Sequence, residues 1–225
     1  MKLKMMTVWA ALCVTALHAA PQSAASANEG PAAPKVLIDQ FPRMGNQCRM
    51  SAPSLDGAST VGRCYTKPRN WIVLETKYST YARATDRLTF TWHVLLDTST
   101  ATERDKSEKL SPYSYLTTSV SYVNIPKGSH AASVCLHPSY LERYGEPRAV
   151  GLVVTSSSGE ELPCSTSVSE IKGIQSKTKF WENSQIMNAT DASGMPMIER
   201  RQGLVDRSKT IWALVNPNDY EMVVQ

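Results

Sequence analysis

A strict alternation of apolar and polar residues from Arg87 to Asp97 constrains the fold of this chain more than any other feature. Five large apolar side chains fall at every second position of the segment: Leu88, Phe90, Trp92, Val94 and Leu96. Thr89, Thr91 and His93 fall between them. A period of two residues places successive side chains on opposite faces of a β-strand. The segment is therefore predicted to be a strand with one buried face and one polar face.

The same alternation, rich in β-branched and aromatic residues, recurs along most of the chain after residue 34. Further strands are predicted at 35–41, around Cys48 and Cys64, and at 70–80, 113–124, 148–155, 161–169 and 220–224. Residues 204–216 are predicted to be extended, and residues 179–188 fit either a strand or a short helix. Because turn-forming residues separate these segments and helices do not alternate with them, the predicted fold is all-β and mainly antiparallel, an immunoglobulin-like β-sandwich.

Two interruptions of the strand pattern are informative. In His137–Gly145, a proline near the start, the polar run Glu142-Arg143 and a closing glycine predict a helix of one or two turns. Residues 98–112 are charged and rich in Ser and Thr, without apolar periodicity. They are expected to form a solvated loop.

The N-terminus carries the pattern of a cleavable secretory signal peptide. Lys2 and Lys4 precede an apolar core, Met5–Leu17, of about thirteen residues, which is too short for a permanent membrane-spanning helix. The best cleavage site, Ala25-Ser26-Ala27, gives a signal peptide over 1–27, a flexible linker over 28–34 and one domain over 35–225. Export would place this domain in the periplasm, in the outer membrane or at the cell surface, with no transmembrane span in the mature chain.

Four cysteines follow the signal peptide: Cys48, Cys64, Cys135 and Cys164. An even number in an exported chain favours disulfides, and four cysteines allow three connectivities. The pairs Cys48–Cys64 and Cys135–Cys164 are preferred because the members of each pair lie on neighbouring extended segments. A metal site is the alternative, but the spacings lack the close pairs of zinc-binding signatures.

Neither charge nor motifs indicate nucleic-acid binding or catalysis. Removal of the two signal-peptide lysines lowers the net charge from +4 to about +2, and there is no sustained basic run. The sequence contains no nucleophile elbow, no glycine-rich phosphate loop, no HExxH motif and no EF-hand loop. The chain is therefore predicted not to be an enzyme and to use no cofactor or metal.

Three weaker groupings of residues are the alternatives to that prediction. A zinc site of His93, His130 and His137, or a nucleophilic Cys135/His137 pair, would need distances that the sequence does not fix. Four acids are candidate paired carboxylates: Asp97, Glu103, Asp105 and Glu108. A loop this polar lacks the burial that separates the pKa of an acid from that of a base, so these carboxylates are interpreted as solvated.

The tryptophans are the remaining candidates for a binding surface. Trp92 belongs to the apolar set of its strand and is predicted to be core. Trp71, Trp181 and Trp212 are possible surface contacts, since aromatic faces stack on carbohydrate rings. A carbohydrate-binding or adhesin module would need them exposed together on one face.

Four segments together resemble a known family. They are WIVLETKY at 71–78, DRLTFTWHV at 86–94, CLHPSYLERYG at 135–145 and GLVDRSKTIWALVNPNDY at 203–220. In order and spacing they are similar to verrucomicrobial pilus-like proteins, encoded beside type IV pilus genes in mucin-degrading gut commensals. The resemblance covers residues 35–224, and its motifs are structural rather than catalytic.

The resemblance implies an exported immunoglobulin-like sandwich without enzymatic activity. The sequence departs from a pilin because no long N-terminal polymerisation helix is present. The leading hypothesis is therefore a protein associated with the type IV pilus or the outer membrane. It would act through protein–protein contacts, and its sheet edges would be sites for strand addition or for contacts in a homo-oligomer. The alternative is a carbohydrate-binding or adhesin module that contacts host or mucin glycans.

Overall fold

Two long strands, β3 (Asn70–Asp97) and β4 (Tyr113–Leu136), dominate the computed structural model, which describes residues 35–52, 69–102, 110–214 and 222–223. They pair antiparallel almost from end to end, from Ile72 opposite Leu136 to Asp97 opposite Tyr113. The predicted strands at 70–80 and 87–97 are thus one continuous strand. The predicted strand at 113–124 likewise continues to residue 136.

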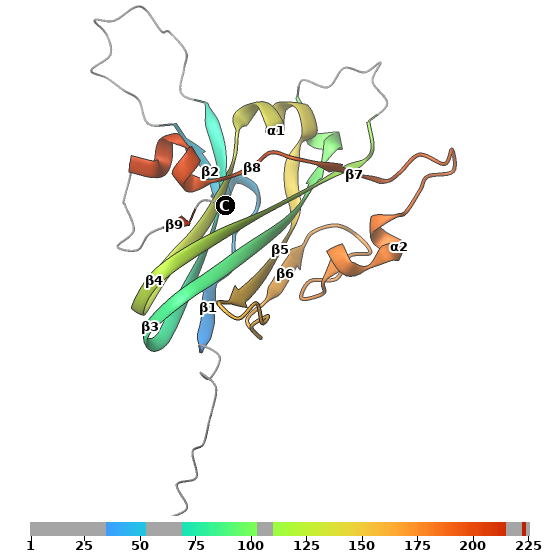
Figure 1. Ribbon diagram of the computed structural model, residues 1–225. Coiled ribbons are helices and arrows are strands. Elements are labelled where there is room, and N and C mark those ends of the chain that lie inside the picture. Colours follow the sequence, from blue (N-terminus) through green and yellow to red (C-terminus); the bar gives the residue numbers. More distant parts are fainter. Residues whose placement is uncertain (1–34, 53–68, 103–109, 215–221, 224–225) are drawn as a thin grey trace, which may run out of the picture. The chain divides into compact units, whose positions relative to one another are not determined.

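Both long strands bend at the same place. Thr80 lies opposite Gly128 and Ala84 opposite Pro126, so residues 81–83 of β3 face Lys127 alone. Such a bulge bends the strand that carries the extra residues. Figure 1 shows β3 and β4 turning back together at this point, so that each strand has two arms. The rings of Tyr78 and Phe90, one from each arm of β3, lie 4.8 Å apart between their centroids, which shows that the arms face one another.

The bend divides one continuous hydrogen-bonded sheet into two layers. In the first layer, β1 (Val36–Gln40) and β2 (Arg49–Ser51) pair with β3, and β8 (Leu204–Asp206) pairs with β4. In the second, the order is β6 (Thr166–Ser169), β5 (Glu146–Ser156), β3, β4 and β7 (Ile198–Arg201). The short β9 (Met222–Val223) also pairs with β4. The predicted all-β sandwich is confirmed, and β7 alone among these strands pairs in parallel.

The core lies between the two layers. The five apolar residues of 88–96 are all fully buried, as the alternation predicts. Ile72 and Leu74 join them from the first arm of β3, in the same apolar cluster. The rings of Phe90 and Tyr122 add an edge-to-face contact between β3 and β4, with centroids 5.6 Å apart.

The helical segments are short, and neighbouring residues along the chain explain where they begin and end. The helix α1 (Pro138–Tyr144) begins where Nδ1 of His137 accepts a hydrogen bond from the Ser139 N–H, and Gly145 follows it with a φ of 82°. This confirms the helix predicted at 137–145. Residues 179–188, which fit either element, form a 3₁₀ turn η4 (Phe180–Glu182) and the helix α2 (Ser184–Met187).

The prediction of an extended segment over 204–216 is wrong for residues 207–214, while residues 215 and 216 lie outside the described part of the chain. The chain there forms the 3₁₀ turns η5 (Arg207–Lys209) and η6 (Ile211–Leu214). The carboxylate of Asp206 accepts a hydrogen bond from the Ser208 N–H at 2.9 Å, and Trp212 N–H bonds to the hydroxyl of Thr210 at 3.2 Å. Such local side-chain bonds compete with strand pairing and favour turns.

A second, smaller apolar cluster covers the outer face of the second layer. Leu95, Tyr115 and Ala149 of the sheet contact Phe180, Met187 and Ile198 of the C-terminal part of the chain. The ring of Trp181 also packs here, directly above Gly151. The absence of a side chain at Gly151 makes room for that ring, because an added Cβ would lie 2.0 Å from a ring carbon of Trp181.

Gly151→Ala is expected to lower the free energy of unfolding by about 1–3 kcal/mol, because the new methyl group overlaps the Trp181 ring. In a Trp181→Ala background the methyl group has room, so the same substitution should have little effect. Urea denaturation of the four proteins gives this double-mutant cycle. An equal effect of Gly151→Ala in both backgrounds would contradict the contact.

Candidate functional site

The three tryptophans do not form a common surface. Trp181 stacks on His93 with parallel rings and centroids 4.2 Å apart, so one face of its ring is covered. Trp212 in η6 is 8% exposed. Trp71 is half-buried and meets the ring of His137 edge to face at 4.8 Å. Trp71 lies on the outer face of the first layer and Trp181 on that of the second, so the structure does not bring together the exposed platform that glycan stacking would require.

The histidines are also separated, and each has a local role. His93 is buried with its Nδ1 2.6 Å from the hydroxyl of Tyr115. His130 lies near the bend, where its Nε2 is 2.8 Å from the carbonyl oxygen of Pro126. His137 caps α1. Across the described residues, no three His, Cys, Asp or Glu side chains gather in a way that could hold a metal ion.

Burial and, to a smaller extent, the nearby charge of Lys179 together lower the pKa of His93 to about 4. The alternation predicts that His93 lies on the polar face of its strand, and the structure confirms that its side chain points away from the central core. Periodicity does not predict that Trp181 covers this face, and therefore it does not predict that His93 is buried.

Of the four candidate carboxylates, only Asp97 lies in the described part of the chain. Its side chain accepts hydrogen bonds from the backbone N–H of Ser99 at 2.9 Å and from the Ser99 hydroxyl at 2.6 Å. It therefore caps the 3₁₀ turn η3 (Thr98–Thr100). Glu103, Asp105 and Glu108 lie outside the described residues.

The structure does not contain the predicted Cys135–Cys164 disulfide, since both thiols are free. Val134 and Leu136 point into the core, so Cys135 between them points to the outer face of β4, under Thr210 and Arg207. Cys164 packs against the core on the inner side. Cys48 is buried and its thiol contacts the carbonyl oxygen of Gly45, whereas Cys64, its predicted partner, lies outside the described residues.

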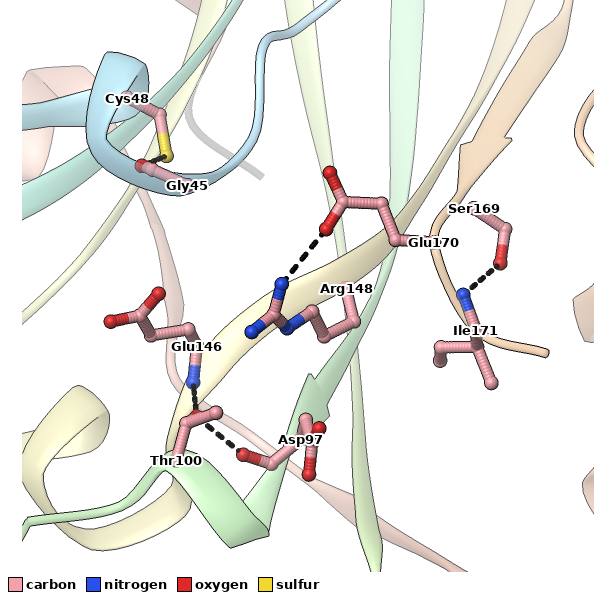
Figure 2. A network of polar contacts seen from close by, with 9 residues as sticks. All are labelled: Gly45, Cys48, Asp97, Thr100, Glu146, Arg148, Ser169, Glu170 and Ile171. Carbon is pink, nitrogen blue, oxygen red and sulfur yellow. Dashed lines mark hydrogen bonds and ion pairs between the residues drawn. The ribbon is translucent and has the colours of Figure 1, made fainter.

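At one end of the sandwich a set of polar contacts joins the ends of several elements (Figure 2). Arg148 and Glu170 form an ion pair at 3.0 Å. The hydroxyl of Thr100 donates to the carbonyl oxygen of Asp97 and accepts from the Glu146 N–H, both at 2.7 Å. These groups satisfy one another, so the network ties β3 to β5 and offers no unpaired group for chemistry.

A surface hollow of about 300 Å³ lies beside this network, between β2, β5 and α1. Its charges are also paired within the chain: Arg49 with Glu146, and Arg69 with Glu142. A second hollow of about 340 Å³ lies on the outer side of the first layer, along Val73, Glu75 and Lys77. Cys48 and Glu75 both line the second hollow, but burial raises the pKa of the Cys48 thiol to about 11, so the hollow holds no activated nucleophile.

The edges of the sheet are the more informative surfaces. The edge at β6 is covered, because the Lys177 N–H donates to the carbonyl oxygen of Ser167 at 2.8 Å and the Ser176 hydroxyl accepts from the Ser169 N–H at 3.0 Å. In contrast, no strand of the described part pairs with the outer edge of β1 or of β7. An unpaired edge presents backbone groups to which another chain can add a strand.

The edge at β7 adjoins a hollow of about 250 Å³ that sequence reasoning missed. Its lining is two tyrosines of α1 and three residues at the end of β7: Tyr140, Tyr144, Arg200, Arg201 and Gln202. The four-residue spacing of the tyrosines within a predicted helix would have placed them on one face. No pattern in the sequence connects that face with the charged run 199–201, because the sequence does not predict β7 as a strand.

These features define the class of protein. It is a two-layered all-β domain whose second layer is covered on its outer face, and several of its strands have one edge that pairs with no strand of the described part. Within the described ranges, no helix is long and apolar enough to cross a membrane. A protein-family model matches residues 48–203. Since the match covers well over half of the chain, the protein belongs to that family.

A crystal structure of a protein from Akkermansia muciniphila has a similar fold. The TM-score is 0.57, with 20% sequence identity over 85% of this chain and 95% of that chain. At this identity the likeness concerns the fold alone. Both comparisons are consistent with the verrucomicrobial resemblance of the sequence. No curated protein matches the chain in sequence.

The stability of the protein should fall as the pH decreases from about 6.5 toward 4. The unfolded chain binds a proton at His93 near pH 6.5, whereas the folded chain does so near pH 4. At pH 4 the loss attributable to His93 should approach about 3 kcal/mol. Urea denaturation across this range checks the expectation. His93→Gln should remove this part of the decrease and the exposed His137→Gln should keep it, and an unchanged pH profile in His93→Gln would contradict it.

Mass spectrometry of the non-reduced mature protein should find no peptide that joins Cys135 to Cys164. Because burial raises the pKa of the Cys135 thiol to about 11, its alkylation at neutral pH should require unfolding. Alkylation with and without urea measures this. A Cys135–Cys164 peptide, or rapid labelling of Cys135 in the folded protein, would contradict the structure.

Proposed function

We propose that this chain is an exported, non-enzymatic protein that works through protein–protein contacts with components of the type IV pilus or the outer membrane. The observation that carries the proposal is the distribution of its free surfaces. The outer face of the second layer is occupied by the chain's own C-terminal part, while β1 and β7 keep open edges in the described structure. Strand edges suit recognition of another protein chain.

Family membership supports this proposal, because the matched family is consistent with verrucomicrobial pilus-like proteins. The secretory signal in the sequence supports a location outside the cytoplasm. The carbohydrate-binding alternative has less support, since Trp181 and Trp212 are engaged in packing.

The tagged mature protein, purified from its own cell envelope, is expected to recover pilus or outer-membrane proteins. Leu37→Lys, at a 50% exposed position of β1, places a charge at an open edge and should reduce this recovery several-fold. Ile211→Lys changes a side chain that is 46% exposed in η6, outside β1 and β7, and serves as the matched control. Quantitative mass spectrometry compares the three preparations.

The proposal fails if the protein is recovered free from the periplasm in cells with and without the pilus genes. If Leu37→Lys recovers as much partner protein as the wild type does, the edge of β1 is not the contact site, and the proposal then depends on the edge of β7.

A further inference from the structure

The strand β1 carries a base, an apolar residue and an acid in a row on one face. Lys35, Leu37 and Asp39 are all exposed and follow one another at every second position. Leu37 lies opposite Ser79, whose hydroxyl donates to the carboxylate of Asp39. The ammonium of Lys35 lies 5.2 Å from the ring centroid of Tyr81, two residues further along β3. The three side chains therefore share the outer face of the first layer.

The backbone of β1 is open at alternate positions. The carbonyl oxygen of Lys35 accepts a hydrogen bond from the Tyr81 N–H at 3.4 Å. In an antiparallel ladder every second residue of a strand bonds to the same neighbour, so the backbone groups of Val36 and Ile38 point to the outer edge. No strand of the described part pairs with that edge. An added strand would bond to these two residues.

We propose that the outer edge of β1 pairs with the same edge of a second copy of this chain, so that one sheet runs through a symmetric dimer. In an antiparallel pairing centred on Leu37, Val36 of one copy faces Ile38 of the other, and their outward backbone groups bond to each other. The two Leu37 side chains face one another across the axis. On each side of them, Lys35 of one copy lies opposite Asp39 of the other. A two-fold interface requires such a self-complementary surface.

The charges select both this register and this partner. A shift by two residues in either direction keeps the backbone bonds but places Leu37 opposite Lys35 or opposite Asp39, and it loses both ion pairs. Opposite charges that face one another across two strands stabilise the pair, and like charges destabilise it. Only the centred register combines two ion pairs with a covered leucine, which is 50% exposed in the single chain. The strand also lacks proline and inward-pointing charge, two features that prevent edge pairing.

The dimer goes beyond the proposed function and does not depend on it. Two copies joined at β1 leave both of their β7 edges open in the described structure. Two linked contact sites bind a partner with several sites more tightly than one site does. Loss of the dimer in Leu37→Lys would therefore lower the recovery of envelope proteins even where these proteins bind at β7.

Sedimentation equilibrium of the mature protein tests the proposal. Because the contact is small, a monomer–dimer equilibrium is expected between about 0.01 and about 0.5 mM protein. The dissociation constant should rise several-fold between about 0.05 M and about 0.5 M salt, since exposed ion pairs are screened. Lys35→Asp and Asp39→Lys each turn two attractive pairs into two repulsive ones, so each variant alone should dimerise at least about tenfold more weakly.

A mixture of these two variants should dimerise again. One copy then carries only acids at the two positions and the other only bases, so both pairs are attractive in a mixed dimer. The double variant Lys35→Asp/Asp39→Lys should dimerise as the wild type does, because each pair is remade with its charges exchanged. Lys172→Asp changes an exposed lysine outside the strands and serves as the matched control. All three positions are exposed, so circular dichroism is expected to show unchanged folding.

The proposal is overturned if the protein stays monomeric at the highest concentration, if the mixed variants dimerise no better than each alone, or if Lys172→Asp weakens the dimer as Lys35→Asp does. These outcomes differ from failure of the proposed function. If the protein is monomeric but recovers envelope proteins that Leu37→Lys loses, β1 binds an envelope protein: the function stands and the dimer is wrong. If the dimer and its charge exchange are observed but no envelope protein is recovered, the dimer stands and the pilus association is wrong.

Discussion

The bend shared by β3 and β4 is the constraint on which the rest of the structure depends. Residues 81–83 of β3 face Lys127 alone, and this bulge turns a single antiparallel ribbon back on itself. The hydroxyl of Thr80 donates to the carbonyl oxygen of Pro126 at 2.7 Å, across the ribbon where it turns. Because one ribbon supplies the centre of both layers, its two arms bring Tyr78 against Phe90 and close the core.

The closed core determines where the protein can meet a partner. Segments that follow β6 return over the outer face of the second layer, where Phe180 and Trp181 pack on the sheet. Trp212, 8% exposed, is likewise withdrawn from the surface. Large aromatic side chains, the usual anchors of an interface, are thus used within the fold. In the described structure, the outer edges of β1 and β7 present backbone groups that pair with no other strand.

The parts of this structure that sequence could predict are those with a local cause. A period of two residues assigns Leu88 and Trp92 to the core, and the order of residues at 137–145 predicts α1 with both its ends. Pairing between segments that lie far apart in the chain cannot be predicted from such local patterns. The bulge opposite Lys127, the parallel pairing of the charged strand β7 and the cover of His93 by Trp181 all depend on partners far along the chain. For the same reason periodicity could show that Cys135 and Cys164 lie on strands or beside them, but not that they lie on opposite sides of a sheet.

The central claim is that the edges of this sandwich, and not its faces, carry its contacts with other proteins. Hydrogen–deuterium exchange of the mature chain, alone and bound to the protein recovered from its envelope, tests it most directly. The account predicts that backbone amides of β1 or β7 gain protection in the complex, while those of β5 and of the central part of β3 are protected in both states. Protection gained on the outer faces around Trp71 or Trp181, with both edges unchanged, would contradict it.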